Sequence, residues 1–202
     1  MARALVALIV LPMALLLTAC GDWRLFSSRP SGELRTVSEA NRVELKPLLR
    51  TAVYRSADAQ SAEVYLTDLP LDRLADLDDN LADLSGTIVQ ISIFMQPKAG
   101  RTPISDDACN AAIRQLVLSG PARGLYGGGG FVVPTGIGSG QLRGSVRGAT
   151  LRMIRSTESF ADPLGPSVLE GSFRAGFDAN LSRVMAQRMA QLAGSLKEVK
   201  AE

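Results

Sequence analysis

The sequence of 202 residues contains no histidine. This absence removes Ser-His-Asp and Cys-His catalysis, the commonest general base of enzymes and the usual zinc sites. Lysine and arginine together number 22, against 20 aspartates and glutamates, so the chain also lacks the basic excess that is typical of nucleic-acid-binding proteins. We therefore expect no nucleic acid partner, no metal and no cofactor. The sequence also favours a protein that is not an enzyme.

The first 19 residues have the features of a secretory signal peptide. Arg3 supplies a short basic start, residues 4–17 are apolar, and the small residue Ala19 stands before the expected cleavage point. The apolar stretch is shorter than the roughly 20 residues that a permanent transmembrane helix needs. We therefore expect residues 1–19 to be removed during export.

The end of this leader, Leu17-Thr18-Ala19-Cys20, resembles the lipobox of bacterial lipoproteins, in which an aliphatic residue and two small residues precede a cysteine. The resemblance covers the leader alone. It implies lipidation of the Cys20 thiol, cleavage after Ala19 and N-acylation of the new terminus, and two or more acyl chains give a stable membrane anchor. Because Gly21 rather than aspartate follows the cysteine, it also implies the outer membrane, with the domain facing the periplasm. The alternative is a secreted protein in which Cys20 is incidental.

Cys109 is the other of the two cysteines, so lipidation of Cys20 would leave it without an intramolecular disulfide partner. Asp106 and Asp107 precede it closely, and neighbouring carboxylates disfavour the thiolate form that a reactive cysteine needs. We therefore expect a buried or merely structural thiol at Cys109.

Composition divides the mature chain into a tether and one domain. Residues 20–33 mix glycine, serine, proline and charged residues, which is typical of a flexible linker, here a lipidated one. Residues 34–202 are long enough for a single globular domain with a substantial core.

Short apolar segments bounded by turn residues predict strands throughout this domain. The clearest is 87–96, which we expect to be central and to pair with 111–119. The predicted strands are 51–56, 62–68, 87–96, 111–119, 146–156 and 168–177.

Residues 70–84 combine leucines and aspartates at helical spacing, with the leucines on one face and the aspartates on the other. The leucines are Leu74, Leu77, Leu81 and Leu84, and the aspartates are Asp72, Asp76, Asp79 and Asp83. The spacing predicts an inserted helix with a solvated acidic face, while an ordered acidic loop remains the alternative, because aspartate is a weak helix former. A calcium site is not expected, since a helix would spread the carboxylates along its length.

Residues 124–148 are rich in glycine and include a run of four, 127–130. The run lacks the Gly-Lys-Ser/Thr ending of a P-loop, and no strand-turn-helix pattern surrounds it as in a dinucleotide-binding turn. We expect a mobile loop with glycines where strands cross. The alternative is a backbone nest that binds an anion beside Arg123, Arg143 and Arg147.

The C-terminal segment, 179–199, predicts an amphipathic helix capped by Asp178 or Asn180. Arg188 falls inside the apolar stripe, where we expect it to reach solvent or to pair with a carboxylate. The predicted fold class is α+β, mainly β: a single antiparallel sheet or a β-sandwich-like domain, with the inserted helix and this C-terminal helix packed on it.

Three functions fit this sequence. The first is a lipid-anchored cell-envelope protein with a non-enzymatic binding or assembly role, which has an envelope protein as its partner. The second is a periplasmic carrier of a small apolar or lipid ligand, which requires a continuous cavity. The third and weakest is a hydrolase that uses two carboxylates. Its candidate residues are Glu63, Asp106, Asp107 and Glu170.

Overall fold

A computed structural model describes residues 31–97 and 109–199. The leader at 1–19, Cys20 and all of the tether except residues 31–33 lie outside the described residues, as do Asp106 and Asp107. The predictions for those residues therefore stay predictions.

Strands dominate the described chain, which confirms the prediction of an α+β, mainly β domain. The first strands are β1 (Gly32–Ser38), β2 (Glu44–Leu45), β3 (Thr51–Arg55), β4 (Ala62–Thr67) and β5 (Ser85–Ile93). The later ones are β6 (Ala111–Ser119), β7 (Ala122–Thr135), β8 (Gln141–Ser156), β9 (Ser167–Phe177) and β10 (Lys197–Glu198). The helices are α1 (Leu71–Ala75) and α2 (Ala179–Gly194).

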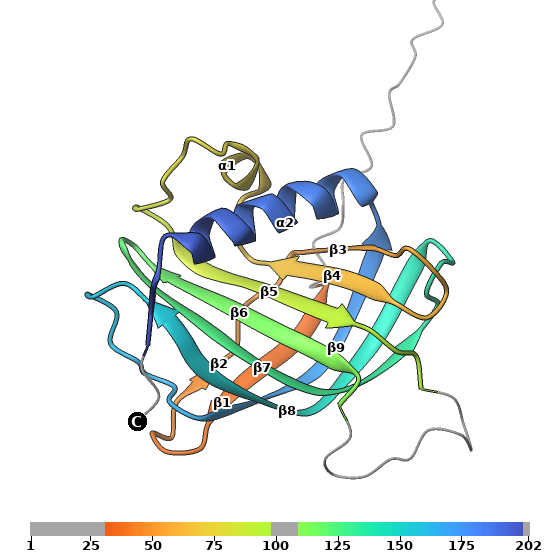
Figure 1. The fold of residues 1–202 in the computed structure, drawn as a ribbon, viewed down its shortest axis with the longest axis horizontal. Coiled ribbons are helices and arrows are strands. Elements are labelled where there is room, and N and C mark those ends of the chain that lie inside the picture. Colours follow the sequence, from red (N-terminus) through yellow and green to blue (C-terminus); the bar gives the residue numbers. More distant parts are fainter. Residues whose placement is uncertain (1–30, 98–108, 200–202) are drawn as a thin grey trace, which may run out of the picture.

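The strands form one sheet that closes on itself (Figure 1). From β3 to β9 each strand pairs antiparallel with the next along the chain. Because this is an odd number of alternating strands, the first and last run the same way, and β9 closes the sheet through a parallel pair with β3. β1 pairs antiparallel with β9 along the same edge, while the short β2 and β10 border β1 and β8. The single-sheet architecture is thus the one observed, with one parallel pair that the sequence did not predict.

Alternation along the strands sends every second side chain into the closed sheet. The inward side chains form a packed apolar interior that includes Tyr54, Tyr126 and Phe173. A buried polar pair lies among them, in which the Thr36 hydroxyl donates a 2.7 Å hydrogen bond to Gln115 Oε1. In the part of the chain that the structure describes, these buried side chains form one cluster inside the sheet.

A second core lies between the outer face of the sheet and α2, which crosses β3 to β7 (Figure 1). Asp178 begins the helix, as predicted, because its carboxylate accepts a 2.8 Å hydrogen bond from the Leu181 amide. Met185, Met189 and Leu192 are buried against the sheet. The helix ends earlier than predicted, since the chain returns to the sheet as β10. No helix within 31–97 or 109–199 is long and apolar enough to cross a membrane.

The segment 70–84 is helical only at its start. α1 begins at Leu71 and ends at Ala75, so the predicted helix is wrong for the rest of the segment, which forms the alternative, an ordered acidic loop. Side chains there bind nearby backbone amides, as in the hydrogen bonds from Asp78 N to Asp76 and from Leu81 N to Asp79. Aspartate and asparagine compete in this way with helical hydrogen bonding.

The glycine-rich run belongs to a strand, so the prediction of a loop there is wrong. β7 runs through 127–130 and pairs with β6 and β8. A Cβ on Gly128 would lie 1.9 Å from the Thr150 carbonyl oxygen of β8. The glycines therefore allow two backbones to approach closely, a known reason for glycine inside strands.

The six predicted strands are confirmed as β3, β4, β5, β6, β8 and β9, with small shifts at their ends, and 111–119 pairs with β5 as expected. The sequence missed β1, which begins at Gly32 inside the predicted tether. It carries the charged residues Glu33 and Arg35 on its exposed face, so its apolar pattern is weak.

Candidate binding groove on the outer face of the sheet

An open groove of about 1290 Å³ lies on the outer face of the sheet. It lies over β8 and β9 and extends to α1 and the start of α2. Residues of β1 and β3, which both pair with β9, also line it. Its polar and charged lining comprises Ser31, Glu33, Arg50, Thr51, Thr135, Gln141, Arg143, Ser145, Ser172, Arg174 and Asp178.

Two arginines face each other in this groove. Arg143 on β8 and Arg174 on β9 are direct cross-strand partners, and Ser145 and Ser172 form the next pair along the strands. Directly opposed residues on adjacent strands have Cβ atoms roughly 5 Å apart, and like charges in such positions repel. No acidic side chain among the described residues forms an ion pair with either guanidinium.

Three further charged residues line the groove. Arg50 adds a positive charge, and Glu33 and Asp178 are acidic. The Asp178 carboxylate is engaged as the cap of α2. Glu33 stands opposite Ser172 across the pairing of β1 with β9. The groove is therefore basic overall, with one carboxylate at its β1 side.

One part of the groove is apolar. Phe177, at the end of β9, is 51% exposed, although one edge of its ring meets the Tyr54 ring at a centroid distance of 5.5 Å. Leu71 of α1 and Leu181 of α2 also line the groove. The surface thus joins a basic region to an apolar one.

The described chain begins at this groove. The Ser31 amide donates a 2.8 Å hydrogen bond to the Leu49 carbonyl, and the Ser31 carbonyl accepts one of 2.8 Å from the Arg174 amide. Its hydroxyl donates to the Arg50 carbonyl at 2.8 Å. Ser31, which belongs to the predicted tether, is therefore held at the groove by its backbone and its hydroxyl.

A smaller hollow of about 650 Å³ lies at one end of the closed sheet, near Gly86 and Phe160. Asp68 lines it and accepts a 2.6 Å hydrogen bond from the Thr87 amide. Burial raises the pKa of the Asp68 carboxyl above its usual value despite that bond. Asp68 is the one acidic or basic side chain among the described residues that line this hollow, so these residues offer no acid-base pair.

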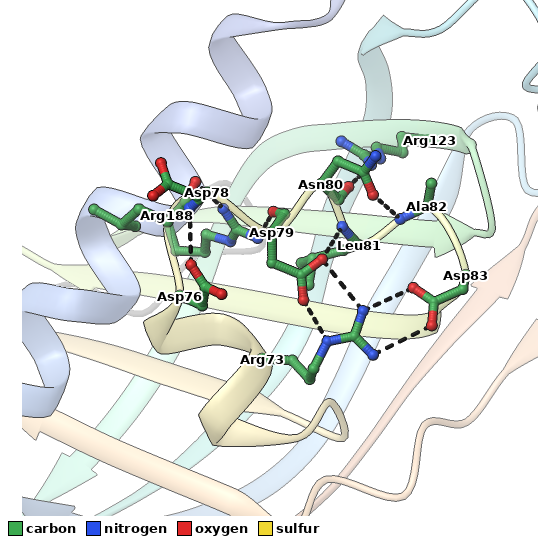
Figure 2. Close-up of polar contacts among 11 residues, drawn as sticks. Arg73, Asp76, Asp78, Asp79, Asn80, Leu81, Ala82, Asp83, Arg123 and Arg188 are labelled. Atoms are coloured by element: carbon green, nitrogen blue, oxygen red, sulfur yellow. Dashed lines mark hydrogen bonds and ion pairs between the residues drawn. The ribbon is translucent and has the colours of Figure 1, made fainter.

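Three arginines hold the acidic loop after α1, namely Arg73, Arg188 and Arg123 (Figure 2). The Arg73 guanidinium binds the carboxylates of Asp79 and Asp83. The hydrogen bond from Arg73 lowers the pKa of Asp79 to about 2. No group of three or more acidic or cysteine side chains that could hold a metal occurs in residues 31–97 and 109–199.

Arg188 is the second of these arginines, and the expectation that it reaches solvent or a carboxylate is wrong. It is 1% exposed. Its guanidinium donates to the backbone carbonyls of Leu77, at 3.1 Å, and Asp79, and to the Gln191 side chain. Burial lowers the pKa of Arg188 below its usual value. The residue therefore attaches the acidic loop to α2.

The anion nest proposed for the glycine-rich segment does not form. Arg123 lies at the start of β7 and donates to the Asn80 carbonyl, whereas Arg143 pairs with the opposite end of β7. Arg147 is exposed opposite Phe131. Of the three arginines, only Arg143 lines the groove.

The described carboxylates suggested for hydrolysis are each bound to an arginine. Glu63 accepts a 2.8 Å hydrogen bond from Arg55, and Glu170 forms an ion pair with Arg35. Burial and the Glu63 charge raise the pKa of the neighbouring Tyr65 to about 12. The structure therefore does not present Glu63 or Glu170 as half of a catalytic carboxylate pair.

Cys109 is exposed, so of the expected buried or merely structural thiol the buried alternative is wrong and the structural one stays a prediction. Its sulfur lies 3.4 Å from the Ala111 carbonyl oxygen at the start of β6. Residues 98–108, which precede it, and Cys20, the predicted lipidation site, lie outside the described residues.

The sequence pattern indicated Arg143 only as part of a possible anion nest, and it did not indicate Arg174. The signal that finds both is the alternation within their strands, which turns each arginine outward between buried neighbours. Only the register of β8 with β9 places them together. Comparison with known protein families, with characterised proteins and with solved structures found no match.

Proposed function

We propose that this protein is a lipid-anchored, non-enzymatic binding protein of the bacterial cell envelope, held at the outer membrane through Cys20 and facing the periplasm. The lipobox-like end of the leader supports the anchor. The observation that carries the binding role is the groove with its opposed pair, Arg143 and Arg174, with which no described carboxylate forms an ion pair.

The position of Ser31 supports the same account. Between Cys20 and Ser31 an extended chain reaches at most roughly 40 Å. Because Ser31 lies in the groove, a lipid on Cys20 would keep the groove within that distance of the bilayer. The binding surface and the anchor would then act at the same membrane.

The carrier and hydrolase alternatives receive less support. The closed sheet is filled by side chains such as Tyr126 and Phe173, which leaves its interior unsuited to an enclosed apolar ligand. Glu63 and Glu170 are bound to arginines. Neither observation favours a second function.

Site-specific photo-crosslinking in a diderm bacterium tests the binding role. A photoreactive residue replaces Ser172 in the groove or Thr150, an exposed position elsewhere on β8. We expect a defined adduct from position 172 and none from position 150. Equal adducts at both positions, or none at either, would show that the groove is not the binding surface.

A further inference from the structure

We infer that the groove binds the head group of a phospholipid, with Arg143 and Arg174 on its single phosphate and the glycerol and first acyl carbons along Phe177 and Leu181. This inference rests on the proposed function and specifies the ligand of the same groove.

The arginine pair accounts for the phosphate. Two guanidinium groups on opposed positions of adjacent strands repel when empty and converge on one anion when filled. Arginine donors match phosphate oxygens in geometry and form strong charge-assisted hydrogen bonds. Ser145 and Ser172, the next opposed pair, add hydroxyl donors on the same face.

Glu33 limits how much negative charge the groove accepts. Its carboxylate lines the groove beside β9 and forms no ion pair with another described residue. A ligand with several anionic groups would place one of them near this carboxylate, which costs energy. A head group with one phosphate and an ammonium, as in phosphatidylethanolamine, instead offers Glu33 a partner.

The apolar wall accounts for the rest of the ligand. Phe177 exposes half of its surface, and Leu71 and Leu181 of the two helices continue the apolar lining. A groove of about 1290 Å³ is far larger than an inorganic phosphate requires. The combination of an apolar wall with a few polar groups is typical of sites for organic ligands.

Titration calorimetry of the full mature chain, residues 20–202, tests the inference. Cys20→Ala removes the acyl chain that would compete for the groove, so the outcome does not depend on lipidation. The probes are dioctanoyl phosphatidylethanolamine below its micelle-forming concentration, inorganic phosphate, and dioctanoylglycerol, which lacks the phosphate.

Two double variants are compared in that background. Arg143→Gln with Arg174→Gln removes the pair, and Arg114→Gln with Arg152→Gln removes the same charge from exposed positions outside the groove. We expect one phospholipid per chain in the parent and in the control. We expect affinity to fall about tenfold or more in the groove variant, as charge-assisted hydrogen bonds are lost.

Each contrary result overturns the inference in its own way. Equal affinity in all three proteins would exclude the arginine pair. Inorganic phosphate that binds as tightly as the phospholipid would identify a free anion as the ligand, and equal affinity for dioctanoylglycerol would exclude phosphate recognition. Thermal unfolding of the groove variant shows whether it is folded.

The cross-linking experiment tests the proposed function separately, since a groove that recognises another class of ligand would still give an adduct at position 172.

Discussion

Arg143 and Arg174 lie directly opposite each other on β8 and β9, with no ion-pair partner among the described residues. Such a pair costs stability when the groove is empty, because like charges on opposed strand positions repel. Arg143→Gln should therefore stabilise the ligand-free protein by about 0.2–1 kcal/mol at low salt. Salt screens exposed charges, so the gain should disappear near 1 M salt.

Denaturant unfolding at low and at high salt measures this effect. Arg152→Gln, on the same strand but outside the groove, serves as the control and should change stability less. A loss of stability in Arg143→Gln at low salt would mean that the guanidinium has a stabilising partner, which contradicts the description of the pair as unneutralised.

Arg188 makes its main contribution by holding the acidic loop. Arg188→Ala removes the donor to the Asp79 carbonyl and leaves the Leu77 carbonyl with the Gln191 side chain alone, and it should cost about 2–4 kcal/mol. Hydrogen exchange should become faster in residues 76–84 than in the strands. Arg183→Ala, at an exposed position of the same helix, should leave both measurements almost unchanged, and an equal effect of the two variants would contradict this role.

Asp79 should make the loop sensitive to acid. Its folded-state pKa is lowered to about 2 by the Arg73 hydrogen bond, below the unfolded value of about 3.9. The unfolded state therefore takes up the proton first, so the stabilisation is complete above about pH 5 and is lost as the pH falls towards 2.

Urea unfolding between neutral pH and pH 3 tests this behaviour in Asp79→Asn and in Asp78→Asn, a neighbour that forms no ion pair with a described residue. The first variant should be less stable than the wild type at neutral pH and should approach it in acid. The second should follow the wild type throughout. A difference between Asp79→Asn and the wild type that stays constant with pH would contradict the lowered pKa.

Position 128 requires glycine because the backbone of β8 lies too close to it for a side chain. In Gly128→Ala the new methyl group would stand 1.9 Å from the Thr150 carbonyl oxygen, and relief requires backbone movement, so we expect a loss of at least about 3 kcal/mol. Gly176→Ala meets nothing within 4 Å and should be nearly neutral. Thermal unfolding of the two variants distinguishes a steric cause from a general effect of replacing glycine in a strand.

Local patterns were sufficient for most strands and for the cap of α2. The apolar alternation of 87–96 predicts β5, and Asp178 marks the start of the helix. The pattern failed at 76–84, where Asp76 and Asp79 bind backbone amides and Arg188 captures backbone carbonyls from a distant helix. Helical spacing alone does not reveal such competing bonds.

The groove could not be predicted from the sequence of any single strand. Arg143 and Arg174 are 31 positions apart in the sequence, and the register of β8 with β9 alone brings them together. The glycine run likewise depends on a contact between strands, because the Thr150 carbonyl of β8 lies too close to Gly128 for a side chain to fit. Glycine-rich composition is typical of loops as well as of closely packed strands, so the sequence could not separate the two.

The proposed membrane anchor depends on lipidation of Cys20. The intact mass of the membrane-extracted protein tests this modification directly. In a diderm bacterium the wild type should lose residues 1–19, gain the mass of a triacyl modification and sediment with the outer membrane. Cys20→Ala should lack the acyl mass and the membrane association. A wild type that is soluble and carries no acyl mass would contradict the account, and Cys20 and Cys109 would then have to be examined as a disulfide pair.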